Sequence, residues 1–376
     1  MAASIALVLA VAACAIASNA TAAADHRQIA CGDAITTDTR LAANLVDCPG
    51  AGLVIGADGI TLDLGGHAVD GDGSGDDVGI DVSGHRGVTI MHGAVREFTE
   101  GVLVSEASEV AVRGVTSTGQ AHGGITVDRS DAVTIAGNDV RDSGAGIIVN
   151  RGDRVLVSAN RVSGSAFAGI TTFASQHVSI AGNTVTTSPT DAAVGLFDGS
   201  SHNEVTGNRL SRSAAGVALN NGSSDNLVAG NAIAHDDSGV IADVGTHDNR
   251  VLGNVVEDST FEGIAVVGSD GNLLAGNVVA RNGAADDAGG IVLIPFPDDP
   301  SQTSDANTLT DNIALDNGGD GIHVAQGQPA NLLRGNRADR NSRLGIDAAP
   351  GTVDGGGNSA ARNGDPRQCV GVACGG

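Results

Sequence analysis

The chain has 376 residues and a formal net charge of −24, and all 20 of its cationic residues are arginines. Such acidity argues against binding of nucleic acid, which needs a basic surface, and against an acidic polysaccharide unless a divalent cation bridges the two. Trp and Tyr are absent, while the 56 glycines suit a fold made of tight turns.

Residues 1–24 are predicted to be an export signal, because the apolar run SIALVLAVAACAIA precedes the small residues of SNATAAAD. The run is too short to span a membrane. Residues 11–14 (VAAC) also resemble a bacterial lipoprotein box, so attachment of a lipid at Cys14 is the alternative to cleavage. We therefore expect a secreted protein or, alternatively, a cell-surface lipoprotein.

The other four cysteines form two local pairs, one near each end of the mature chain: Cys31 with Cys48, and Cys369 with Cys374. Proximity predicts these two disulfides, although four cysteines allow three connectivities. Bridges of this kind suit an exported protein and would pin its ends. We expect an N-terminal cap over 25–52 and a C-terminal cap over 361–376.

Between the caps, residues 53–360 repeat a short phrase that begins and ends with Asn, as in NEVTGN at 203–208. A Gly followed by apolar residues precedes most phrases, as in GVALN at 216–220. The unit is too short for two helices, and its apolar residues alternate with period two. A repeat of roughly 23 residues with this pattern predicts a parallel β-helix.

Thirteen turn markers between His67 and Asn358 give 12 intervals, hence about 12 coils and, at about 4.8 Å per coil, a rod of roughly 58 Å. The asparagines should stack in ladders, and Asn also tolerates left-handed turns. Phe167 and Phe261 recur at one repeat position, which predicts core packing. A proline-containing loop at 294–305 interrupts the period and should wall one end of a surface groove.

These motifs resemble the right-handed parallel β-helix proteins of the pectate-lyase-like superfamily. The closer similarity is to sugar-binding and sugar-hydrolase repeats and to periplasmic copper-maturation proteins of the same fold. The resemblance covers residues 53 to about 360 and implies one all-β domain. It also implies that the ligand site is the outer face of one parallel sheet, here the sheet of Gly-Ile strands.

Alternation within the Gly-Ile strands predicts one polar segment on that outer face: Asp128, Asn150, Asp198, Asn220 and Asp243. Asp198 and Asp243 should lie about 10 Å apart, near the carboxyl spacing of inverting glycosidases. We interpret them as an acid–base pair, with Asp128 as a third catalytic candidate and Arg151 or His122 orienting. The predicted substrate-binding residues are Asn150, Arg151, Asn220, Phe173 and Phe296. Outward Asp and Asn on a solvated sheet are the simpler alternative.

An insertion in the first coil carries Asp70, Asp72, Ser74 and, twelve positions from its start, Asp81. Oxygen ligands at alternate positions follow the spacing of an EF-hand loop, which predicts a Ca²⁺ site. Asp replaces the usual final Glu, and a solvated Gly/Asp-rich loop is the alternative.

The leading functional hypothesis is a monomeric protein that binds or modifies an extracellular polysaccharide, as a lyase, hydrolase or epimerase would. Lys, Tyr and the Asp-Pro-His motif of alginate epimerases are absent, which argues against uronate chemistry. The second hypothesis is a non-enzymatic, acidic surface or matrix protein. A periplasmic metal-maturation role is the third, and it rests on resemblance alone.

Overall fold

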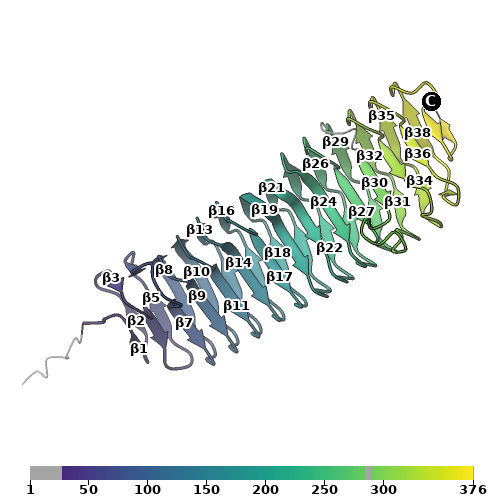
Figure 1. Ribbon diagram of the computed structural model, residues 1–376. Coiled ribbons are helices and arrows are strands. Elements are labelled where there is room, and N and C mark those ends of the chain that lie inside the picture. Colours follow the sequence, from purple (N-terminus) through teal and green to yellow (C-terminus); the bar gives the residue numbers. More distant parts are fainter. Residues whose placement is uncertain (1–27, 284–288, 376) are drawn as a thin grey trace, which may run out of the picture.

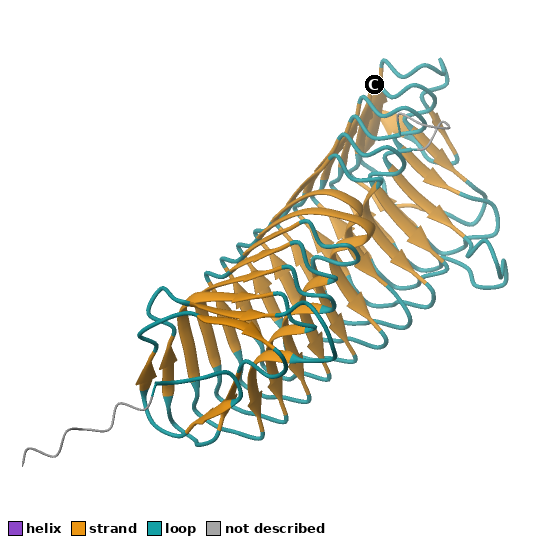
Figure 2. Cartoon of the chain, turned by 60° about the vertical axis from the view of Figure 1, so that its left-hand side comes forward, coloured by secondary structure: helices purple, strands orange, loops and turns teal. Residues whose placement is uncertain are grey.

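The chain forms a long rod of stacked β-coils in the computed structural model, which describes residues 28–283 and 289–375 (Figure 1). The predicted signal segment and Cys14 lie outside these residues. Every regular element in the described part is a strand, so no described helix is long and apolar enough to cross a membrane. Figure 2 shows the strands gathered on separate faces, with turns between them.

The first face, the Gly-Ile sheet, is parallel throughout, as between β1 and β4 or β33 and β36. Its strands are β1 (Asp33–Ile35), β4 (Leu53–Ile55), β7 (Val78–Ser83), β9 (Glu100–Ser105), β11 (Gly123–Asp128), β14 (Ala145–Asn150), β17 (Ile170–Phe173), β19 (Thr184–Phe197), β21 (Arg209–Leu219), β24 (Ser238–Asp243), β27 (Ile264–Val267), β30 (Ile291–Ile294), β33 (Ile322–Val324), β36 (Ile346–Ala348) and β39 (Cys369–Val370).

The second face, the second sheet, contains the strands that lie inside the Asn phrases. They are β2 (Thr39–Arg40), β5 (Thr61–Asp63), β8 (Thr89–Arg96), β10 (Ala111–Thr118), β12 (Thr134–Ala136), β15 (Leu156–Ser158), β18 (Ser179–Ala181), β20 (Glu204–Thr206), β22 (Leu227–Ala229), β25 (Arg250–Leu252), β28 (Leu273–Ala275), β31 (Thr308–Thr310), β34 (Leu332–Arg334) and β37 (Val353–Asp354). Strands β8 and β10 are long enough to continue into the third face.

The third face, the third sheet, follows the closing Asn of each phrase, and β19 and β21 bend from it into the Gly-Ile sheet. Its other strands are β3 (Leu45–Cys48), β6 (Ala68–Gly71), β13 (Asp139–Arg141), β16 (Arg161–Ser163), β23 (Ala232–Ala234), β26 (Val255–Glu257), β29 (Val278–Ala280), β32 (Ile313–Leu315), β35 (Arg337–Asp339), β38 (Asn358–Ala361) and β40 (Cys374–Gly375). The solenoid has about 14 turns, and the predicted all-β parallel β-helix is confirmed.

Two more turns are present than the predicted 12, because the parallel pairing starts before residue 53 and continues past 360. Strand β1 pairs with β4, and β38 pairs with β40, so segments predicted as caps already belong to the stacked sheets. Both predicted disulfides are confirmed, Cys31–Cys48 in the first coil and Cys369–Cys374 in the last.

The core is a stack of small aliphatic side chains, which alternation along each strand points inward. Phe98 is the only phenylalanine buried in it among the described residues. The predicted core packing of Phe167 and Phe261 is wrong, because their side chains are 60% and 38% exposed. Both lie in turns that precede Gly-Ile strands, where the chain has already left the sheet interior.

Buried asparagines form ladders along the rod, as predicted. Asn231 donates from its backbone N and its Nδ2 to Oδ1 of Asn254 (3.0 and 2.9 Å), and Asn254 donates in the same way to Asn277. One ladder runs through the closing asparagines from Asn138 to Asn358 and a second through the opening ones from Asn203 to Asn331. Each amide thereby satisfies buried backbone groups of the turn, which would otherwise be costly.

The left-handed conformation falls on the residue before each Asn rather than on the Asn itself. Gly207 and Gly230, which precede closing asparagines, have φ of 62° and 63°, and His202, which precedes an opening one, has φ of 57°. Glycine adopts this conformation without the strain that a Cβ brings. The ladder asparagines therefore contribute their side-chain amides and not a left-handed backbone.

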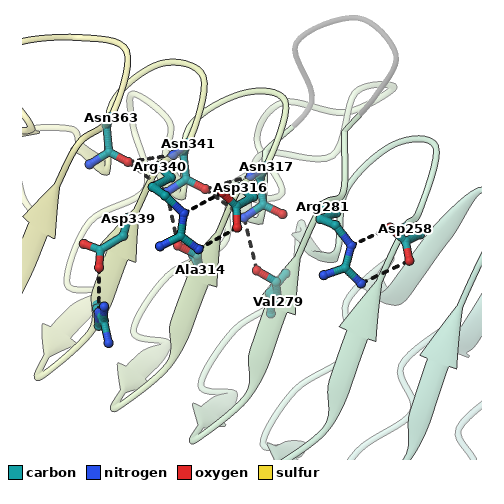
Figure 3. Close-up of polar contacts among 11 residues, drawn as sticks. Asp258, Val279, Arg281, Ala314, Asp316, Asn317, Asp339, Arg340, Asn341 and Asn363 are labelled. Atoms are coloured by element: carbon teal, nitrogen blue, oxygen red, sulfur yellow. Dashed lines mark hydrogen bonds and ion pairs between the residues drawn. The ribbon is translucent and has the colours of Figure 1, made fainter.

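A third ladder lies on the third-sheet side, where Asn282 donates to Asn317. It continues through Asn341 to Asn363 (Figure 3). Ion pairs join neighbouring coils beside it, Arg281 with Asp258 (2.8 Å) and Arg340 with Asp316 (2.7 Å). These pairs are largely exposed, and each adds less than about 1 kcal/mol.

Asp236 occupies the same ladder position three coils before Asn317 and is almost fully buried. Its Oδ1 accepts a hydrogen bond from the backbone N of Ser213 (2.8 Å), but its Oδ2 has no partner. Burial raises the pKa of this carboxyl to about 7, and the charge of Asp237 adds to the effect. An amide at this position would avoid the burial of a charge and the repulsion from Asp237.

We expect Asp236→Asn to raise the free energy of unfolding by about 2 kcal/mol at pH 8. The folded pKa lies above the ordinary value of 3.8, so the native protein loses stability as pH rises from about 4 to 7. The gain from Asn should therefore shrink towards pH 4. Unfolding by denaturant at several pH values measures the difference in free energy between the variant and the wild type. Asp225→Asn is the control, because Asp225 is exposed. A gain independent of pH would contradict this account.

Candidate active-site groove on the Gly-Ile sheet

A groove of about 450 Å³ lies on the outer face of the Gly-Ile sheet, over β17, β19, β21 and β24. Phe173 and Phe197 form one end, with ring centroids 5.6 Å apart and planes tilted by 46°. Asn220 and Asp243 continue the groove along the rod. The groove therefore has an apolar part, formed by the two phenyl rings, and a polar part, formed by the amide of Asn220 and the carboxyl of Asp243.

Strand register explains why these residues share one column. Phe173 pairs with Phe197, and Leu196 pairs with Leu219, which places Phe197 next to Asn220. Leu219 pairs with Ala242, so Asn220 in turn lies next to Asp243. Successive members come from adjacent coils, about 4.8 Å apart.

An irregular coil builds the wall of the groove. The ladder asparagines Asn183 and Asn208 are 25 residues apart, whereas Asn208 and Asn231 are 23 apart. The extra residues shift the register of β19 against β21 between Ser188 and Ala192. Thr190 and Asp191, which lie in this shifted segment, line the groove. Sequence reasoning missed both, although the longer spacing was visible.

Asp243 has the environment of a general acid. Burial raises the pKa of its carboxyl to about 6, and its Oδ1 has no hydrogen-bond partner. Oδ1 of Asn220, in the next coil, is also buried without a partner. Both groups line the groove, so a ligand there would find two unsatisfied oxygens.

Asp198 lines the same groove, but the predicted register around it is wrong. An outward Asp198 on the strand would also point Leu196 outward, because side chains two residues apart share a face. Leu196 is instead fully buried, and Phe197 takes the column position assigned to Asp198. Asp198 follows in the turn with φ of 55°, and its Oδ1 accepts a hydrogen bond from Nδ2 of Asn221 (2.9 Å). Sequence reasoning therefore placed Asp198 in the right groove for the wrong reason and overlooked Phe197.

Asp128 and Asn150 belong to the same column but lie outside the groove. Nδ2 of Asn150 donates to Oδ1 of Asp128 (2.8 Å), which also faces the guanidinium of Arg151 (3.4 Å). The other oxygen of Asp128 pairs with Arg129 (2.9 Å). This carboxylate is thus held in a surface ion cluster, and the structure does not bring it together with Asp243.

The two remaining predicted groups are also elsewhere. Nδ1 of His122 lies 2.5 Å from Oε1 of Glu100, on an earlier coil. Phe296 belongs to the 294–305 loop, where its backbone N donates to the carbonyl of Gln302 (2.9 Å). Neither side chain lines the groove, and the loop does not form its end wall.

Two of the three carboxylates in the predicted calcium loop already have hydrogen-bond partners. Oδ1 of Asp72 accepts from the backbone N and the Oγ of Ser74 (2.9 and 2.8 Å), and Asp81 accepts from Ser83. Ser74 and Asp81 line a shallow depression, whereas Asp70 lies on β6. Calcium binding by this loop stays a prediction.

Metal-ligating side chains converge elsewhere on the Gly-Ile sheet, at Asp320, His323 and Asp347. Burial raises the pKa of Asp320, while a hydrogen bond from the backbone N of Leu344 opposes that shift. Soft ligands are scarce, because Met91 is the only methionine between residues 28 and 375 and the four described cysteines are in disulfides.

Solved structures with similar folds include two modules of mannuronan C-5 epimerases from Azotobacter vinelandii. The AlgE4 A-module has a TM-score of 0.61 at 15% identity, covering 92% of this chain and 91% of that one. The AlgE6 A-module has a TM-score of 0.64 at 15% identity, covering 88% and 91%. At such identity the likeness shows the fold alone, and it confirms the predicted resemblance to right-handed parallel β-helix proteins. A comparison with curated proteins gave no match.

A family match is more specific. The sequence matches the family described as periplasmic copper-binding protein (NosD) over residues 65–237 and again over 168–295. Together these matches span more than half of the chain and include the whole groove. The chain therefore belongs to the NosD family of periplasmic copper-binding proteins.

Proposed function

We propose that this protein is exported and acts on a neutral carbohydrate chain that binds along the groove of the Gly-Ile sheet. The observation that carries the proposal is the placement of Phe173, Phe197 and Asp243 in one cavity. Phenyl faces pack against the apolar faces of sugar rings, while carboxyl and amide groups bond their hydroxyls.

The charge of the groove favours a neutral substrate. Its acidic side chains are Asp191, Asp198 and Asp243, and no Arg or His lines it. A uronate polymer would bring negative charge to a surface that is already acidic. Lyases and epimerases of uronates also need a group that neutralises the substrate carboxylate, and the lining residues do not supply one.

Acid–base hydrolysis fits the remaining groups best. Asp243, protonated up to about pH 6, would donate its proton to the glycosidic oxygen as that bond breaks. Water would attack the anomeric carbon and give its proton to a second carboxylate, Asp198 or Asp191. A carboxylic acid that protonates the leaving oxygen and a second carboxyl group that receives the proton of water are the two groups that inverting glycosidases use.

The description of the family and the pairing of the cysteines both support export of the protein. The matching family is described as periplasmic, and the four described cysteines form disulfides, which persist in oxidising compartments. We propose a periplasmic or extracellular location. Retention of a glycan without product would instead identify a binding module of the same groove. A monomeric state and the absence of a nucleic-acid partner stay predictions.

Phe197→Ala tests the groove. We expect the variant to bind the preferred neutral glycan roughly tenfold more weakly, because it loses about 1.4 kcal/mol of ring packing. Phe261→Ala is the matched control, since Phe261 is partly exposed and lies outside the groove. Both variants are tested on a panel of neutral and uronate polysaccharides, with Ca²⁺ and with chelator. Calorimetry measures binding of the polysaccharide, and release of reducing ends measures its hydrolysis. Preference for a uronate polymer, or equal loss in both variants, would contradict the proposal.

A further inference from the structure

A second cavity of about 290 Å³ lies on the same sheet face, over β30, β33 and β36. His323 points outward from β33, and Asp347 holds the paired position on β36. Asp320 precedes β33, where the backbone N of Leu344 fixes its Oδ1 (2.7 Å). Two neighbouring coils therefore bring these side chains into one cavity, Asp320 and His323 from the first and Asp347 from the second.

The imidazole of His323 is the unusual member of this group. Its Nδ1 is buried and makes no hydrogen bond, yet it faces Oδ2 of Asp347 at 3.3 Å and Oδ2 of Asp320 at 3.6 Å. A buried ring nitrogen normally has a partner. Here two carboxylate oxygens surround it at distances too long or too poorly aligned for a hydrogen bond.

We infer that Asp320, His323 and Asp347 form a binding site for a divalent transition-metal ion. One ligand atom from each residue lies within 4.8 Å of the other two. Ligands that bind such an ion with bonds of about 2.0–2.2 Å lie roughly 3–3.5 Å apart, so small side-chain rotations suffice. The ion would satisfy the Nδ1 that the protein leaves without a partner.

The donor set limits the choice of ion. One imidazole and two carboxylates suit Zn²⁺ or Cu²⁺, whereas Cu⁺ prefers thiolates and thioethers, which the described residues offer neither free nor clustered. Ca²⁺ prefers six to eight oxygen ligands. Copper, the metal in the family's description, therefore fits this group in its divalent state.

The alternative occupant of the cavity is a cation of the protein itself. Arg343 lines the same cavity, and its charge weakly opposes the rise that burial causes in the pKa of Asp320. If the guanidinium already neutralises the carboxylates, no metal is needed. The two arrangements differ in a measurable way, because only the metal site takes up one ion per chain and loses it when His323 is replaced.

The site is independent of the proposed hydrolysis, because none of its residues lines the groove around Asp243. Four strand steps separate β21, at the centre of that groove, from β33, roughly 19 Å along the rod. Failure of either idea therefore leaves the other untouched.

The test is metal binding by the full chain after treatment with chelator. Equilibrium dialysis against Zn²⁺ or Cu²⁺ should give one ion per chain, and His323→Gln and Asp347→Asn should each lower the affinity about 100-fold or more. The matched control is His177→Gln, because His177 stacks on His202 (5.8 Å between ring centroids) and offers the competing histidine pair. That control should bind metal normally.

Electron paramagnetic resonance of the Cu²⁺-loaded wild-type protein gives a readout that needs no variant. Coupling to one imidazole nitrogen is expected, whereas two nitrogens would indicate the His177–His202 pair. Circular dichroism and the melting temperature show whether each variant is folded. Absence of stoichiometric binding, binding unchanged in His323→Gln, or loss in His177→Gln would overturn the assignment.

Discussion

Asp243→Asn is expected to lower the rate of glycan hydrolysis by two to three orders of magnitude while leaving glycan binding nearly intact. Asparagine keeps the size and the hydrogen-bonding capacity of the side chain but cannot donate an acidic proton. Burial raises the pKa of the carboxyl it replaces to about 6, so that group keeps its proton up to about that pH. The comparison of turnover with binding separates loss of the acid from loss of the groove.

The pH profile should reveal the same group. A general acid works while it holds its proton, so the wild-type rate should fall as pH rises through about 6. This descending limb should disappear from whatever rate remains in Asp243→Asn. Asp225→Asn, which changes an exposed turn carboxylate outside the groove, should leave both rate and profile unchanged. Full turnover in Asp243→Asn would exclude the assigned role.

Asn254→Ala is expected to lower the free energy of unfolding by roughly 3–5 kcal/mol, among the largest effects of any single substitution in this rod. The side chain is fully buried, and its Oδ1 accepts from the backbone N and the Nδ2 of Asn231. Its own Nδ2 donates to the carbonyl of Val228 (2.9 Å). Alanine leaves all of these groups unpaired inside the turn.

Chemical denaturation monitored by circular dichroism measures this effect. Arg250→Ala is the control, because Arg250 is exposed on the neighbouring β25 and should change stability by less than about 0.5 kcal/mol. A small effect of Asn254→Ala would mean that water replaces the ladder amide. The ladders would then be a consequence of stacking and would contribute little to its stability.

The architecture was predictable because each coil repeats the same local signals. The Asn phrases and Gly-Ile strands recur along most of the chain, so period, strand positions and ladders all follow from the sequence. The paired cysteines likewise indicated their disulfides by proximity. The register between coils was harder to predict, because a shift of one residue turns every side chain of a strand to the other face of the sheet. That shift is why Leu196 is buried and why Phe197 was overlooked.

The sites were less predictable because they depend on departures from the repeat. The wall at Thr190 and Asp191 arises from a coil with a local register shift, and alternation rules do not say where such a shift points its side chains. Alternation along β33 and β36 accounts for the outward positions of His323 and Asp347, but Asp320 reaches them from outside the strand. The pKa of Asp243 follows from burial by its neighbours, which a sequence does not display.

The hydrogen bonds between coils run along the length of the rod, and this determines how the protein would respond to tension. A pull on the two ends puts the same tension on every coil interface, and the terminal coils, which have a neighbour on one side only, would detach first. Each freed coil of about 23 residues would release roughly 75 Å of extended chain in place of about 4.8 Å of rod. The bridges Cys31–Cys48 and Cys369–Cys374 keep part of the first and last coils from extending. The same stacking that makes the rod stiff in compression would thus make it highly extensible under sustained load.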